Sequence, residues 1–124
     1  MSLYWVAEVG DDWDDVAAEM ERVFRFAREA ATKERSVVFV VNADDLLGRR
    51  GAGSAMLATG ILSATRTLAL EGWRKGWTAN VVAWDGETGT REDAEELARH
   101  LAATGTVTGE VVRIGPGHIG KALP

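Results

Sequence analysis

The run SVVFVVN at residues 36–42 constrains the fold most, because every residue between its terminal serine and asparagine is apolar and strand-forming. Such a run is typical of a strand that is covered on both faces, as in a parallel sheet. Three further stretches rich in strand-forming residues lie at residues 3–9, 77–84 and 110–114. We therefore expect the core to be built on a sheet of about four strands.

Three helical patterns separate these strands. Residues 12–31 begin among aspartates and place apolar residues at helical spacing, which predicts an amphipathic helix. Residues 51–71 are expected to form a long helix of mostly small residues. Gly60 in its interior lowers the stability of the helix by about 1 kcal/mol relative to alanine. We therefore expect a glycine at this position because another backbone approaches closely there. The third helix starts at a predicted N-cap formed by Thr90 and Asp93.

The alternation of strands and helices predicts a single α/β domain over residues 1–124. Right-handed crossovers that add strands in one direction leave all their helices on one face of the sheet. The strand at residues 36–42 would then lack cover on its second face. Either one crossover folds to that face or another chain covers it, and for this reason we expect at least a dimer.

Composition limits the classes of function. The 124 residues suffice for one domain, and the absence of cysteine excludes disulfides, thiolate catalysis and cysteine-bound zinc. A net charge of −5 without a basic stripe argues against nucleic acid as a partner. Because no apolar stretch is long enough to span a membrane, we expect a cytoplasmic protein that does not bind membranes.

A glycine-bearing loop before the second helix invites comparison with phosphate-binding loops. Gly48, Gly51 and Gly53 follow a strand and open a helix, with Arg49 and Arg50 beside them. The spacing differs from the dinucleotide fingerprint, and no acidic residue ends a following strand to bind a ribose. We interpret the loop as a structural turn with surface arginines.

No metal site is expected. His100 has Glu96 one turn earlier, but the only other histidine is His118 in the tail. The aspartates at residues 11–15 coincide with a helix start, where acidic side chains interact favourably with the helix dipole. Ser54 has no nearby histidine or lysine in sequence that would activate it as a nucleophile.

Five pieces of the chain, in order over roughly residues 11–120, resemble the C-terminal half of a short-chain dehydrogenase/reductase. The resemblance implies a partial Rossmann-like parallel sheet of about four strands with three crossover helices. The matching pieces are DDWDDVAAEMERVFRFAREA, SVVFVVN, GRRGAGSAMLATGILSATRTLALEG, KGWTANVVAWDG and TVTGEVVRIGPG.

The resemblance also implies that the catalytic pair of the family is absent. The family tyrosine falls at Ser54 and its lysine at Ala58, or at Ala55 and Thr59 if the loop is one residue shorter. The tyrosine would supply a proton to the substrate, and a serine without a neighbouring cation cannot replace it near neutral pH. The only tyrosine of the chain is Tyr4.

The other family features are missing as well. The family serine falls at Val41 or Asn42, and the asparagine at Glu19 or Met20. The glycine-rich turn that binds the pyrophosphate of the cofactor lies in the family's N-terminal half, which has no counterpart here. We therefore expect no catalytic residue, no cofactor-binding residue and no bound cofactor.

The first functional hypothesis is a catalytically inactive domain that acts by self-association or as the partner of a full-length relative. In the family, the helices that match residues 12–31 and 51–71 form a four-helix bundle between subunits. The residues expected at this interface are Val16, Met20, Val23, Phe24, Ala55, Thr59, Ser63 and Thr67.

The alternative is a subunit of a split NAD(P)-dependent oxidoreductase. Another chain would then supply the nucleotide-binding half and the catalytic acid.

The strand at residues 3–9 would be an open sheet edge, which natural proteins cover or pair. This edge is a second candidate surface for a partner.

Overall fold

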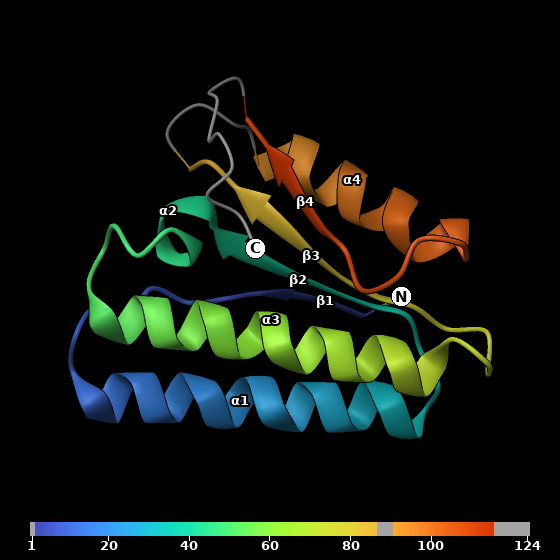
Figure 1. The fold of residues 1–124 in the computed structure, drawn as a ribbon, viewed down its shortest axis with the longest axis horizontal. Helices are drawn as coiled ribbons and strands as arrows, with labels where there is room; N and C mark the ends of the chain where they lie inside the picture. The colour runs from blue at the N-terminus through green and yellow to red at the C-terminus, as the bar shows by residue number, and fades with distance from the viewer. Residues whose placement is uncertain (1, 87–90, 116–124) are drawn as a thin grey trace.

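The computed structural model describes residues 2–86 and 91–115, and within them a four-stranded sheet in the order β1-β2-β3-β4. Every neighbouring pair of strands is parallel. The strands are β1 (Ser2–Trp5), β2 (Val37–Asn42), β3 (Ala79–Trp84) and β4 (Val111–Ile114). The expected α/β fold with a parallel sheet of about four strands is confirmed (Figure 1).

Three long helices connect the strands, as expected. They are α1 (Trp13–Thr32), α3 (Ala52–Gly72) and α4 (Arg91–Thr104). A short helix, α2 (Ala43–Leu46), lies where a loop was expected. It begins because the Oδ1 atom of Asn42 accepts a hydrogen bond of 2.9 Å from the backbone N–H of Asp44, which caps the first turn.

The first strand is shorter than the sequence pattern indicated. Pairing continues one residue beyond β1, where the N–H of Val6 donates to the carbonyl of Val40 at 3.0 Å. The next amide, that of Ala7, instead donates to the carboxylate of Glu19 at 2.7 Å. A side chain from α1 thus replaces the sheet as the hydrogen-bond partner and ends the strand.

The helices lie on both faces of the sheet, with α1 and α3 on one side and α4 on the other (Figure 1). Phe39 and Val81 pack against α1 and α3, whereas Val38, Val40 and Val82 pack against α4. Since the strand order advances in one direction, the crossover through α4 has the opposite hand to the first two. The buried strand therefore obtains its second cover from its own chain.

This arrangement corrects one argument made from the sequence. We expected a dimer because helices on one face would leave β2 uncovered, but α4 covers that second face. Of the two solutions considered, the structure adopts the crossover that folds to the other side. A case for association must rest on another surface.

The start of α4 also contacts β1 across the second face. Trp5 and Trp84 pack edge to face with ring centroids 5.2 Å apart, and the guanidinium of Arg91 lies 3.9 Å from the centroid of Trp5. Such cation–π contact stabilises a partly exposed aromatic ring. The predicted N-cap at Thr90 and the tail histidine His118 lie outside the described residues.

None of the helices within residues 2–86 and 91–115 is long and apolar enough to cross a membrane.

Candidate interaction surface

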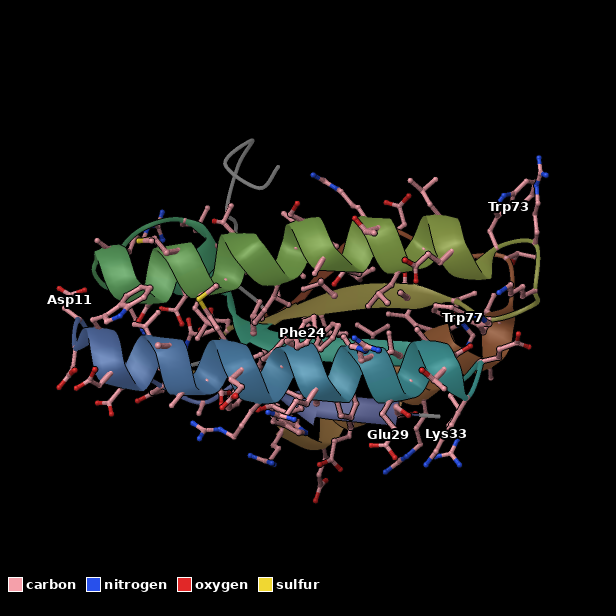
Figure 2. The ribbon with its side chains drawn as sticks, turned by 90° about the horizontal axis from the view of Figure 1, so that it is seen from below. Asp11, Phe24, Glu29, Lys33, Trp73 and Trp77 are labelled. Atoms are coloured by element: carbon pink, nitrogen blue, oxygen red, sulfur yellow. The ribbon has the colours of Figure 1, made fainter. Side chains whose placement is uncertain are left out.

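Helices α1 and α3 pack side by side and form one layer, here called the α1–α3 layer (Figure 2). Its inner side faces the sheet and packs mainly through apolar side chains. Val16 is 1% exposed and Val23 6% exposed on α1, and Leu57 and Ile61 are buried opposite them on α3. This inner side is part of the core and is closed to solvent.

The outer side of the layer exposes large apolar side chains. Trp13, Met20 and Phe24 on α1 are 62%, 41% and 59% exposed, and Met56 on α3 is 58% exposed. The three α1 residues are spaced by seven and four positions, so they share one stripe of the helix. The apolar pattern of α1 is thus wider than the part of the helix that the sheet covers.

Two connected hollows follow the boundary between the helices. The central groove, of about 180 Å³, is lined by Met20, Val23, Phe24, Ala27, Leu57, Gly60, Ile61 and Ala64. The end groove, of about 340 Å³, continues toward the C-terminal ends of both helices and is lined by Phe24, Ala27, Arg28, Ala31, Ala64, Thr67, Leu68 and Glu71. Phe24 lies between the two helices, where the grooves meet (Figure 2).

Gly60 opens the floor of the central groove. A Cβ atom placed on Gly60 would have no atom within 4 Å apart from its own helix and neighbours. The close backbone approach that we expected at this glycine is therefore not made within the described part of the chain. The exposed backbone leaves room for a residue of another molecule.

The residues expected at an interface divide into two groups. Val16 and Val23 are buried in the core and have little surface to offer a partner. The others lie on the outer side or at its margin. Met20, Phe24, Thr59, Ser63 and Thr67 are exposed, and Ala55 is partly exposed.

Comparison with known proteins identifies the fold. No family model matches the chain, and no curated protein matches its sequence. Among solved structures, a short-chain dehydrogenase from Mycobacterium avium matches with a TM-score of 0.68 and 21% identity. The chain has a short-chain dehydrogenase-like fold. The match covers 96% of this chain and 52% of the neighbour, so the chain spans about half of that protein's length.

The positions that the resemblance assigns to the dehydrogenase tyrosine and lysine lie on α3. Ser54 and Ala58 are 4% and 2% exposed, so both side chains are packed in the interior. Ala55 and Thr59, the alternative pair, have no acidic proton near neutral pH. With either alignment, α3 presents no phenol and no ammonium group at these positions.

The only tyrosine of the chain is hydrogen-bonded to a buried carboxylate. The hydroxyl of Tyr4 donates to Oε1 of Glu19 at 3.0 Å, and Nε of Arg22 donates to the same oxygen at 2.7 Å. Burial, followed by the bond to Glu19, raises the pKa of Tyr4 above its ordinary value. A phenol with a raised pKa is a weaker acid, and its partner is a structural carboxylate.

Glu19 is the polar residue that sequence reasoning missed. It is only 1% exposed and accepts hydrogen bonds from Tyr4, Ala7 and Arg22. Its position among the valines of α1 is the available sequence signal, because a charged residue on an apolar helix stripe needs a partner when buried.

The glycine loop before α3 is packed against the start of α1. A Cβ on Gly53 would lie 2.4 Å from the carbonyl oxygen of Gly10, and the N–H of Gly53 donates to Oδ1 of Asp11 at 2.9 Å. A carboxylate of the chain itself therefore occupies the position that an anion takes at a helix N-terminus. These contacts support the interpretation of the loop as a structural turn.

The arginines of this loop are engaged as well. Nε of Arg50 lies 2.8 Å from Asp45, and its Nη1 lies 3.2 Å from Glu8. Burial is the largest influence on Asp45 and raises the pKa of its carboxyl, although Arg50 opposes that shift. Within the ranges 2–86 and 91–115, no three acidic or histidine side chains gather in a way that could hold a metal ion.

Proposed function

We propose that this chain is a catalytically inactive domain with a short-chain dehydrogenase-like fold, and that it acts by associating through the outer side of the α1–α3 layer. The partner is a second copy or a full-length relative of the same fold. The exposed apolar stripe of Trp13, Met20 and Phe24, beside a groove with an open glycine, is the observation that supports this proposal. Exposed apolar patches of this kind mark interaction sites.

The composition of α3 supports the lack of catalysis. The positions that correspond to the proton donor and its lysine hold small side chains, two of them buried. Tyr4, the one phenol, is hydrogen-bonded to Glu19 and has a raised pKa. The positions on α3 that correspond to the catalytic pair therefore offer no phenol and no ammonium group that could protonate a carbonyl.

Sedimentation velocity over a range of protein concentrations tests the association. We expect the wild type to form dimers and Phe24→Glu to remain monomeric with an unchanged circular dichroism spectrum. Ala103→Glu is the control, because Ala103 is exposed on α4, which lies on the other face of the sheet from the α1–α3 layer. A wild type that is monomeric at every concentration excludes self-association and leaves the full-length relative as the partner to test.

The alternative function, a subunit of a split NAD(P)-dependent oxidoreductase, has two observations in its favour. β1 is an edge of the four-stranded sheet, and the chain covers only 52% of its dehydrogenase neighbour. Titration of NADH and NADPH, followed by thermal shift, distinguishes the two functions. Binding of either nucleotide with micromolar affinity by the chain alone would contradict the proposal of an inactive domain.

A further inference from the structure

A groove that contains two arginines lies at the end of the sheet where the strands begin. It has a volume of about 450 Å³ and is lined by Arg35, Ser36, Arg99, Ala102 and Ala103. The first two residues immediately precede β2, and the other three lie in the second half of α4. Because α4 covers the face of the sheet opposite α1 and α3, this groove is separate from the α1–α3 layer (Figure 1).

The two segments meet because the end of α4 packs on the start of β2. Leu101 and Val38 are buried in one apolar cluster on this face of the sheet. The residues that follow Leu101 lie at the margin of that contact, where Ala102 is half-buried and Ala103 is exposed. Since both side chains end at a methyl group, the space between α4 and Arg35 stays open.

The two guanidinium groups of the groove are poorly neutralised. Arg35 forms no ion pair with any residue of the ranges 2–86 and 91–115. Nη2 of Arg99 lies 3.7 Å from Glu95, a carboxylate that Arg91 approaches to the same distance. Exposed pairs of this length contribute little. The last turns of α1 and α4 contain no basic residue, so interaction with a helix end does not account for these arginines.

Ser36 adds a hydroxyl group to the groove. Its Oγ accepts hydrogen bonds from the backbone N–H of Thr78 at 3.0 Å and from the Thr78 hydroxyl at 3.2 Å. A hydroxyl oxygen has two acceptor positions and one hydrogen, so the O–H of Ser36 is left to donate to a ligand. The bonds to Thr78 also hold the oxygen in place, which reduces the entropy lost on binding.

We propose that this groove binds the phosphate group of a small phosphorylated molecule. Arg35 and Arg99 pair with the phosphate oxygens, and Ser36 donates to one of them. Guanidinium groups suit this role because their N–H groups match pairs of phosphate oxygens. A volume of 450 Å³ is typical of small-molecule sites, so the rest of the ligand has room along Ala102 and Ala103. This binding is independent of the proposed association.

Titration with inorganic phosphate and with propyl phosphate, followed by ¹H–¹⁵N NMR at constant ionic strength, tests the site. We expect the amide signals of Arg35, Ser36 and Ala103 to shift saturably, with a dissociation constant for phosphate of about 1 mM. Propyl phosphate should bind more tightly, because its alkyl group packs on the alanines.

The arginines should each contribute to the affinity. Arg35→Gln and Arg99→Gln are each expected to weaken phosphate binding about tenfold, the effect of losing one charge-assisted hydrogen bond. Arg25→Gln is the matched control, because it removes the same charge from an exposed position on α1. This variant should bind phosphate like the wild type.

Glu95 provides a test of opposite sign. Glu95→Gln removes the carboxylate that competes for Arg99, so we expect phosphate to bind about threefold more tightly. Glu92→Gln, in the first turn of the same helix, removes the same charge and should leave the affinity nearly unchanged. An equal gain in both variants would mean that only net charge matters, which overturns the site.

The outcomes separate this inference from the proposed function. Ala103→Glu places a carboxylate in the groove and should abolish phosphate binding without affecting association, whereas Phe24→Glu should do the reverse. The site is overturned if chloride at the same ionic strength reproduces the shifts, or if they persist in both arginine variants. Propyl phosphate that binds no more tightly than inorganic phosphate would overturn the assignment of a larger ligand.

Discussion

The carboxylate of Asp11 caps a helix that begins far along the chain, because its Oδ1 accepts a hydrogen bond of 2.9 Å from the N–H of Gly53, 42 residues later. Gly51, the N-cap residue of α3, has no side chain with which to cap the helix. A Cβ on Gly51 would lie 2.7 Å from Asp11. The start of α1 thus supplies the cap of α3 and holds the two helices in register (Figure 2).

Removal of this cap should destabilise the domain. We expect Asp11→Ala to lower the free energy of unfolding by about 1 kcal/mol, the usual effect of losing an N-cap carboxylate. Urea unfolding followed by circular dichroism measures the change. Asp15→Ala is the control from the same acidic cluster, since Asp15 caps neither helix. Equal losses in both variants would mean that the cluster acts through the helix dipole and not through this bond.

The buried Glu19 should be among the most sensitive positions of the chain. Glu19→Ala removes the acceptor of Tyr4, Ala7 and Arg22, and we expect a loss of about 3 kcal/mol because buried donors remain unpaired. Tyr4→Phe removes one of these bonds and should cost about 1 kcal/mol. Guanidinium unfolding compares the two variants. A cost for Glu19→Ala no larger than that for Tyr4→Phe would contradict the assigned role.

Glu34, in the turn that follows α1, has an unfavourable backbone conformation. Glu34 has φ of +53°, the only positive φ of a non-glycine residue within the described ranges. Its N–H and that of Arg35 bond to the carbonyls of Ala31 and Ala30, which is a Schellman arrangement that glycine prefers. We expect Glu34→Gly to stabilise the domain by about 1 kcal/mol, measured by thermal unfolding. Glu34→Ala is the control and should give no such gain, because alanine retains the Cβ atom.

Much of the fold followed from local patterns. The continuous apolar run of β2 and the alternation of strands and helices predicted a parallel sheet, and the structure has one. The side of the sheet occupied by α4 could not be predicted, because the rule for right-handed crossovers gives the opposite answer. Contacts such as that of Arg91 with Trp5, between distant segments, contribute to this choice and leave no periodic signal.

The candidate surface was predicted in part. The spacing of Met20 and Phe24 placed them on the apolar stripe of α1, but periodicity cannot tell which part of a wide stripe faces the sheet. The structure buries Val16 and Val23 and exposes Trp13. Glu19 was missed because two of its three partners, Tyr4 and Ala7, lie on β1 and in the loop after it, which the pattern of α1 alone does not reveal.

Two glycines of α3 should respond to the same substitution with opposite signs. Gly53→Ala places a Cβ 2.4 Å from the backbone oxygen of Gly10 and 2.9 Å from Val16, so we expect a loss of about 2 kcal/mol. Gly60→Ala meets no atom within 4 Å and improves helix propensity, so we expect a gain of about 1 kcal/mol. Chemical unfolding at protein concentrations too low for dimerisation measures both changes in the free energy of unfolding. Gly60→Arg should fold equally well but sediment as a monomer, because its side chain would fill the space that a partner needs. A stable Gly60→Arg dimer would show that association does not use the central groove.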